Sequence, residues 1–351
     1  MRKLYVHVGF HKTGTSSIQS FFHQHREHLR GYGFLYPLAG IVPAYPGHHN
    51  LAWELARDRR FDSRRGTFSS LFSEVQAFDG DVLISSEGFE GVLGYPHRWT
   101  ALREYAKRCG YVLRLLVFLR EQASYLESLF LQNLVLGFGE CFRSDLEECL
   151  THGEFRKRDW RFHFDYLKLI TTLKGCGFDQ LIVRDYSPDG SLDVIDAICE
   201  AMNLSSVAQS GLERSHKNAR HSLRDYLIRF HDNRFPTQRT GHRAKNLHAI
   251  GDGIGKLAMV APLRTQIRNR FISDNIALAQ EFNLSALTNL TADTQRATEN
   301  ISDIARVFSF ETSLLLRRWF GEGHAAPTEY RRWVGWVNQH RASPSFNDSP
   351  L

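Results

Sequence analysis

The segment from Leu4 to Ser20 constrains this chain more than any other. Its first residues, Leu4–Val8, form an apolar run that predicts a buried strand, and residues 9–17 (Gly-Phe-His-Lys-Thr-Gly-Thr-Ser-Ser) predict a tight turn and a helix start. A strand, a loop of small residues and a helix N-terminus bring backbone N–H groups and the helix dipole to one point, which favours an anion. Lysine adds a mobile positive charge. The sequence therefore predicts a phosphate site built from Lys12, Thr13, Gly14, Thr15, Ser16 and Ser17.

Two simpler readings of this loop are less favoured. An ordinary strand-to-helix turn needs one capping hydroxyl and no lysine, whereas this loop has several hydroxyls and Lys12. The usual nucleotide-triphosphate loop has glycine, four residues, and then Gly-Lys-Ser/Thr. Here Lys12 precedes Gly14 instead of following it, so the loop differs from that pattern.

The order of predicted elements indicates an α/β fold with a doubly wound parallel sheet. Strands are expected at residues 4–8, 81–86, 111–119 and 180–183, alternating with helices at 15–29, 51–57, 68–78, 99–109, 121–136, 162–173 and 192–202. After about residue 222 only helices are expected, at 222–233, 263–282, 303–319 and 327–340. We therefore expect an α/β core over 1–222, a helical region over 223–341 that packs on the core or forms a lid, and a disordered tail over 342–351.

Charge and hydropathy narrow the function classes. The formal charge of +6 suits an anionic ligand, but the chain has no long basic run, so nucleic acid is not the expected partner. No run of about 18 apolar residues predicts a membrane span. Residues 1–3 lead straight into the first strand without the pattern of a signal peptide, so a cytoplasmic protein is expected. Whether the chain forms a homo-oligomer is left open.

A second anion site is expected at the end of the strand over 111–119. Arg120 follows this strand directly, and Ser128 lies eight residues further on, in the next predicted helix. Open α/β sheets bind ligands at the carboxyl ends of their strands. A guanidinium group can bind a phosphate through two parallel hydrogen bonds, and a hydroxyl adds a further donor. Each residue alone is more simply explained as a surface residue, but the loop upstream makes a shared ligand the better interpretation.

Together these motifs resemble a known family. The loop over 9–17 resembles the 5′-phosphosulfate loop of sulfotransferases that use 3′-phosphoadenosine 5′-phosphosulfate (PAPS), and the spacing of Arg120 and Ser128 resembles their 3′-phosphate site. The resemblance covers residues 3–222, most clearly 5–20 and 112–130, and is closer to the bacterial and glycan-type branch than to the cytosolic one. It implies a P-loop-like three-layer sandwich, PAPS as co-substrate without a metal, and transfer of a sulfuryl group to a hydroxyl or amine of a saccharide, glycolipid or small metabolite.

The resemblance also implies roles for individual residues. Lys12 would bind the 5′-phosphosulfate and neutralise the leaving oxygen, and Glu87, after the strand over 81–86, would be the general base. His11 is the alternative base, and a helix-capping or surface role is the simpler alternative for Glu87. Apart from the resemblance, His48 and His49 in the loop before Asn50 are weaker candidates for the base, with a role in shaping the acceptor pocket or simple solvation as the alternatives. The basic segment with Lys217, Asn218 and Arg220 resembles a late loop that closes over the nucleotide, with a solvated linker as an equal alternative.

Two other functions stay open at this point. One is a P-loop kinase that uses Mg-ATP, although Gly-Lys-Ser/Thr and a clear magnesium-binding aspartate are missing. The other is an inactive nucleotide-binding or interaction module, against which Lys12, Arg120 and Ser128 argue. Binding of adenosine 3′,5′-bisphosphate without metal distinguishes the three.

Overall fold

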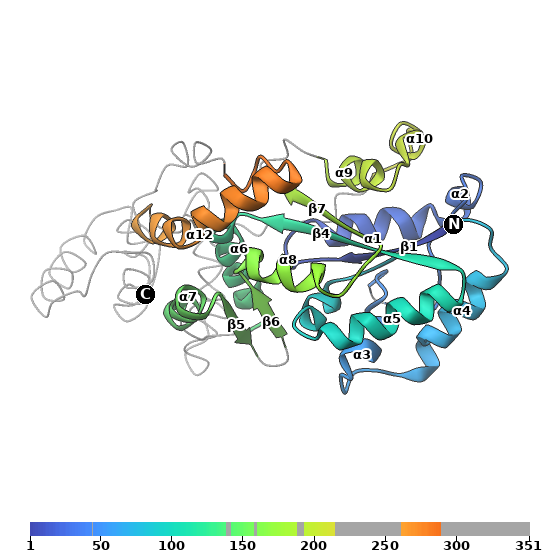
Figure 1. Ribbon diagram of the computed structural model, residues 1–351, viewed down its shortest axis with the longest axis horizontal. Coiled ribbons are helices and arrows are strands. Elements are labelled where there is room, and N and C mark those ends of the chain that lie inside the picture. Colours follow the sequence, from blue (N-terminus) through green and yellow to red (C-terminus); the bar gives the residue numbers. More distant parts are fainter. Residues whose placement is uncertain (44, 138–141, 158–159, 188–192, 215–260, 289–351) are drawn as a thin grey trace, which may run out of the picture. The chain divides into compact units, whose positions relative to one another are not determined.

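The computed structural model describes residues 1–43, 45–137, 142–157, 160–187, 193–214 and 261–288 (Figure 1). The chain divides into two compact units. The first contains Met1–Glu121, Thr151–Asn218 and Phe271–Asn289, and the second contains Gln122–Leu150, Ala219–Arg270 and Leu290–Leu351. Among the described residues, no helix combines the length and the apolar character that crossing a membrane requires.

The first unit is built on a parallel sheet of five strands in the order β2-β3-β1-β4-β7 (Figure 1). The strands are β1 (Arg2–Val8), β2 (Phe34–Leu35), β3 (Asp81–Ser86), β4 (Tyr111–Arg120) and β7 (Gln180–Tyr186). In the central strand β1, Val8 is level with Ser86 of β3 on one side and with Val117 of β4 on the other. The α/β fold with a central parallel sheet is therefore confirmed.

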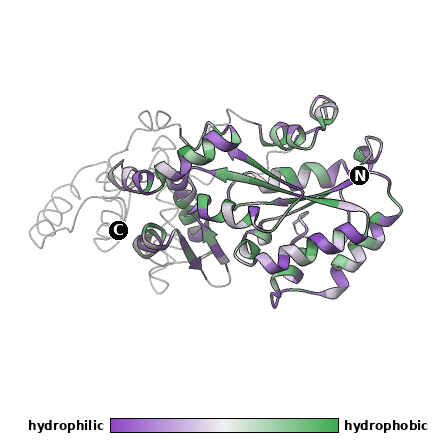
Figure 2. Cartoon of the chain, in the orientation of Figure 1, coloured by the Kyte–Doolittle hydropathy of each residue, from purple (hydrophilic) through white to green (hydrophobic). Residues whose placement is uncertain are grey.

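Hydrophobic burial explains why these segments form strands. Strands of a parallel sheet are covered on both faces and so tend to be continuously apolar. Leu4, Tyr5, Val6 and Val8 are at most 1% exposed, and Leu115–Leu119 is completely buried. Figure 2 shows the sheet strands as largely hydrophobic, whereas the helices carry both hydrophobic and hydrophilic residues.

The helices of the first unit surround this sheet. Their bounds are α1 (Thr15–Gln24), α2 (Arg26–Arg30), α3 (His49–Ala56), α4 (Phe68–Gln76), α5 (Pro96–Arg108), α8 (Tyr166–Lys174), α9 (Val194–Ala201) and α10 (Ser205–Ala208), with 3₁₀ turns η1 (Ser63–Arg65) and η2 (Glu87–Val92). Ile18 and Phe22 of α1 and Ile198 of α9 share one hydrophobic cluster with Tyr5 and Leu116 of the sheet. The spacing of the α1 residues is that of an amphipathic helix. α5 packs against β4.

Two predicted helices were wrong in their extent. The helix expected over 162–173 is preceded by an antiparallel hairpin of β5 (Glu154–Lys157) and β6 (Trp160–His163), and α8 begins only at Tyr166. The side chain of Asp165 accepts a hydrogen bond from the backbone N–H of Lys168, which caps the helix at this point. The helix expected over 15–29 is divided at His25 into α1 and α2.

The second unit contains α6 (Gln122–Val135) and α7 (Phe142–His152), and α12 (Ala261–Phe282) begins in it and ends in the first unit. Within the second unit, Arg264 of α12 forms an ion pair with Glu127 of α6. The expected boundary at residue 222, most of the expected helical region over 223–341, and the tail over 342–351 lie outside the described residues.

Candidate active site

The strand order places the candidate site where the direction of the chain reverses. From β1 the chain continues to β2 at one edge of the sheet, whereas from β4 it continues to β7 at the other edge. The segments that follow β1 and β4 therefore diverge, and open α/β sheets bind ligands in the crevice that such a divergence leaves. The loop over residues 9–14 follows β1, and Arg120 ends β4. The loop and Arg120 of the second predicted motif therefore both lie at this point.

The loop after β1 has the backbone geometry of an anion site. Gly14 is the N-cap of α1 with φ of 79°, and Lys12 has the left-handed φ of 64°. Glycine is required at position 9 because a Cβ there would lie 2.5 Å from the Thr15 side chain. Within the described residues no side chain caps α1, so its first turn offers backbone N–H groups to a ligand.

The hydroxyls of this loop divide into two groups. Thr13 and Thr15 are buried, and both donate to the carbonyl oxygen of Phe10, at 2.7 and 3.3 Å. These two hydroxyls therefore close the loop on itself. Ser16 is exposed on the first turn of α1, and Ser17 is buried. The structure thus distinguishes hydroxyls that shape the loop from one that faces solvent, although all four were predicted as ligands of the phosphate.

Arg120 contacts the loop directly. Its Nη1 donates to the carbonyl oxygen of Lys12 at 2.7 Å, and its guanidinium group lies over the ring of Tyr186 of β7, 5.6 Å from the centroid. The hydroxyl of Tyr166 donates to the Arg120 carbonyl at 2.8 Å, which holds the end of β4. The same Tyr186 ring limits position 14, where a Cβ would approach it to 3.3 Å. The loop and Arg120 therefore form one cationic region.

A carboxylate faces these cations. Glu87 starts η2 directly after β3, and its side chain is 17% exposed. Its Oε2 accepts from Nε2 of Gln19 at 3.0 Å and lies 3.8 Å from Nδ1 of His49. Lys12 is an exposed residue, but the protein atoms around its ammonium group and the charge of Arg120 lower its pKa, whereas Glu87 raises it. Lys12 and Glu87 therefore interact electrostatically in one site.

The other predicted histidines differ in their surroundings. The ring of His11 packs against Trp160 and Phe162 with centroids 5.5 and 5.2 Å apart, and burial lowers the pKa of His11 to about 4. His48 is completely buried: its Nδ1 accepts from the backbone N–H of Ser85 at 3.1 Å, and its Nε2 donates to the Pro37 carbonyl at 3.0 Å. Both ring nitrogens of His48 are thus used to hold the chain beside β3, and neither is left for an acceptor.

His49 is the histidine that lies beside the carboxylate. Its Nδ1 is 2.9 Å from Oγ of Ser86, and its ring stacks on that of Trp53 with centroids 6.2 Å apart. Burial lowers the pKa of His49, whereas Glu87 raises it. His49 therefore fits the predicted acceptor side of the site, at the end of β3 where Glu87 begins.

The structure does not position four further predicted ligands at this site. Ser128 lies on α6 in the second unit, and its role at the 3′-phosphate stays a prediction. Lys217, Asn218 and Arg220 lie outside the described residues.

Two residues of the site were missed by the sequence analysis. Gln19 is 2% exposed within the apolar face of α1, and a polar residue in such a stripe is the signal that marks it. Glu90 is 1% exposed, and its carboxylate accepts from the backbone N–H groups of His11 and His163, at 3.3 and 3.2 Å. Nothing in the sequence indicates which backbone groups Glu90 reaches. Glu90 therefore joins the loop over residues 9–14 (the anion loop) to the β5–β6 hairpin.

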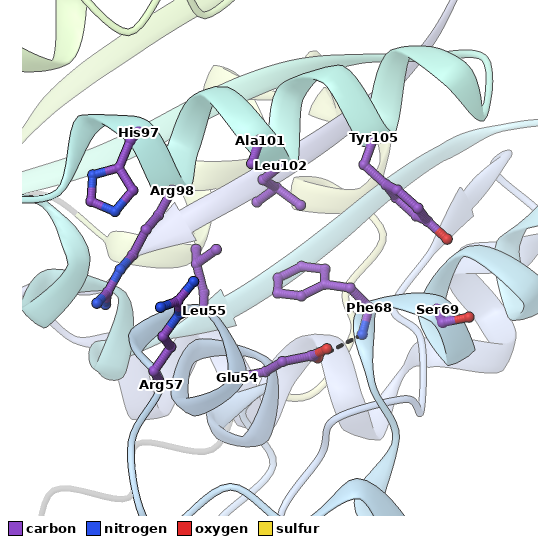
Figure 3. A pocket seen from close by; sticks show the side chains of 10 residues that line it. All are labelled: Glu54, Leu55, Arg57, Phe68, Ser69, His97, Arg98, Ala101, Leu102 and Tyr105. Atoms are coloured by element: carbon purple, nitrogen blue, oxygen red, sulfur yellow. Dashed lines mark hydrogen bonds between the residues drawn. The ribbon is translucent and has the colours of Figure 1, made fainter.

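A separate cavity of about 430 Å³ lies between α3, α4 and α5 (Figure 3). Its wall combines apolar residues such as Phe68 and Leu102 with the charged groups of Glu54, Arg57 and Arg98. Glu54 already accepts from the backbone N–H of Phe68 at 2.7 Å, and Arg98 donates to the Ala56 carbonyl at 2.8 Å. None of the predicted site residues lines this cavity.

Comparisons of the chain with protein-family models, with curated proteins and with solved structures find no match.

Proposed function

We propose that this protein is a PAPS-dependent sulfotransferase with a P-loop-like fold, acting on a hydroxyl or amine of a saccharide, glycolipid or small-metabolite acceptor. The observation that carries the proposal is the hydrogen bond from Arg120 to the Lys12 carbonyl at 2.7 Å. It places the arginine expected at the 3′-phosphate beside the loop expected at the 5′-phosphosulfate. These two groups sit on one ribose in PAPS, so adjacent sites are what this donor requires.

The charges of the site suit the reaction. The acceptor oxygen forms a bond to sulfur while the bond from sulfur to the bridging phosphate oxygen breaks, which releases adenosine 3′,5′-bisphosphate. Lys12 and the first turn of α1 would stabilise the negative charge that develops on that bridging oxygen. The transfer resembles phosphoryl transfer in being in-line and dominated by positioning.

Glu87 is the base that the geometry favours. The acceptor hydroxyl must lose its proton during the transfer, and a positioned base contributes about 10²–10⁴ in rate. Glu87 is partly exposed and interacts electrostatically with Lys12, whereas the imidazole of His11 packs against the rings of Trp160 and Phe162. We therefore propose that the carboxylate of Glu87 accepts the proton of the acceptor hydroxyl.

Nucleotide binding tests the proposal. Adenosine 3′,5′-bisphosphate should bind in the absence of divalent metal, measured by calorimetry and by the rise in melting temperature. Adenosine 5′-monophosphate should bind at least tenfold more weakly because it lacks the 3′-phosphate. Tighter binding of Mg-ATP would favour a kinase, and no binding of any of these nucleotides would favour an interaction module. Transfer of ³⁵S from labelled PAPS to a panel of saccharides then tests the reaction itself.

A further inference from the structure

We propose that Gln19 is a positioning residue for Glu87, and that its side-chain amide fixes the orientation of the catalytic carboxylate. This inference rests on the proposed function, because it names the partner of the base in that reaction. Gln19 lies on α1, the same helix whose N-terminus forms the anion loop. One helix would therefore hold the donor at its start and orient the base slightly more than one turn later.

The geometry leaves the amide of Gln19 little freedom. Its Nε2 lies 3.0 Å from Oε2 of Glu87 and 3.4 Å from Oγ of Ser85, and the residue is 2% exposed. The backbone of Gly47 packs directly on the amide, since a Cβ at that position would lie 2.7 Å from it. A buried amide between two acceptors and a backbone wall has one favourable orientation.

The chemistry of the two groups determines the direction of the hydrogen bond. An ionised carboxylate only accepts, so the amide nitrogen of Gln19, not its oxygen, faces Glu87. A donor of this kind stabilises the charged form of a carboxyl group over the neutral form. Hydrogen bonds to charged groups are also the stronger ones. The hydrogen bond from Gln19 therefore holds Oε2 of Glu87 in one position.

Gln19 is also connected to two further buried polar side chains, Ser85 and His7. Oγ of Ser85, which Gln19 also contacts, lies 2.8 Å from Nδ1 of His7 in the central strand β1. His7 is completely buried, and burial lowers its pKa to about 3, so it stays neutral at physiological pH. The amide is thereby tied to the middle of the sheet, where side chains are most restricted.

Other charged or titratable groups also act on Glu87. His49 lies 3.8 Å from its carboxylate, and electrostatic interactions link Glu87 to His11, Lys12 and Tyr36. These groups stay in place when Gln19 is replaced, so loss of Gln19 should remove the orienting contact and leave the rest of the charge distribution unchanged.

The test compares Gln19→Leu and Gln19→Glu with wild type. Gln19→Leu removes the donor at similar volume, so kcat should fall about 10–100-fold while the Kd for adenosine 3′,5′-bisphosphate changes less than about twofold. Gln19→Glu keeps the shape of the side chain but replaces the amide donor with a carboxyl group beside Glu87, so its kcat should fall at least as far. Gln24→Leu, an exposed position on the same helix, is the matched control and should match wild type.

A second measurement does not depend on the reaction. The ¹³C chemical shift of the Glu87 carboxyl group at neutral pH, assigned with Glu87→Gln, should change in Gln19→Leu and not in Gln24→Leu, because the carboxylate loses its amide donor. An unchanged carboxyl shift, or an unchanged kcat, would overturn the role of Gln19. If Gln19→Leu does not fold, the carboxyl shift and kcat of Gln19→Glu decide. Failure of the wild-type protein to bind adenosine 3′,5′-bisphosphate would instead count against the proposed function.

Discussion

The guanidinium group of Arg120 donates a hydrogen bond to the backbone carbonyl oxygen of Lys12, at 2.7 Å and across 108 residues of sequence. Because the bond uses the backbone of Lys12, it does not depend on the lysine side chain. The contributions of the two cations can therefore be separated by mutation: loss of the ammonium group leaves this contact in place, whereas loss of the guanidinium group removes it.

Arg120→Ala should weaken binding of adenosine 3′,5′-bisphosphate about 10–100-fold, because a charge-assisted contact to a phosphate is lost. Binding of adenosine 5′-monophosphate should change little, so the preference for the 3′-phosphate should largely disappear. Calorimetric titration of both nucleotides measures this. Arg114→Ala is the control on the same strand, since Arg114 contacts the hydroxyl of Tyr5 at 3.3 Å instead of the loop. An equal loss of affinity for both nucleotides in Arg120→Ala would contradict the assignment of Arg120 to the 3′-phosphate.

Substitutions of Lys12 separate the effect of its charge on turnover from the effect of its backbone conformation on stability. Lys12→Ala and Lys12→Gly both remove the ammonium group and should reduce turnover by at least about 100-fold. Because Lys12 has a φ of 64°, the glycine variant should be more stable than the alanine variant by about 1 kcal/mol. Denaturant unfolding measures the difference. Arg57, with a φ of 55°, is the control: the same pair of variants there should differ in stability and not in turnover.

Glu90→Ala should destabilise the protein by about 3 kcal/mol, because the backbone N–H groups of His11 and His163 lose the buried carboxylate that accepts from them. Glu90→Gln keeps one acceptor oxygen and should lose less. The control is Glu74→Ala: the exposed carboxylate of Glu74 also accepts from two backbone N–H groups, those of Leu38 and Ala39, and water can replace it. Chemical denaturation should rank Glu90→Ala well below Glu74→Ala in stability. Equal losses would show that the burial of Glu90 contributes nothing.

Acid should destabilise the fold through its buried histidines. Burial lowers the pKa of His7 and of His48 to about 3, from the ordinary value of 6.5. The unfolded chain therefore binds protons that the folded chain does not, so stability is complete above about pH 6.5 and falls as the pH decreases towards 3. At pH 5 the burial of each of these neutral histidines should lower the free energy of unfolding by about 2 kcal/mol.

Unfolding by denaturant between pH 7 and 5 measures this loss. His48→Gln should reduce the slope of stability against pH, whereas a substitution of the exposed His28 should leave it unchanged. A flat stability between pH 7 and 5 would contradict the assigned burial of the neutral imidazoles.

Local sequence patterns were sufficient for the sheet and for the anion loop. The apolar runs that became β1, β3 and β4 and the small residues around Gly14 act over a few positions, and the hydrophobic burial and backbone freedom that they encode need no distant partner. The hairpin over 154–163 was missed because its eight paired positions mix charged and aromatic residues, and its pairing follows from contacts such as Glu90 to His163.

The sequence by itself determined that this chain builds a parallel α/β sheet and that a basic, glycine-containing turn follows its first strand. Only the tertiary structure decided which side chains meet there: Arg120 with the backbone of Lys12, and Gln19 with Glu87. It also decided that His48 is enclosed while His49 lies beside the carboxylate. The physical reason is the sequence separation of the interacting residues. Strand propensity and turn geometry arise between neighbours in the sequence, whereas these contacts depend on the register of strands that are far apart in the chain.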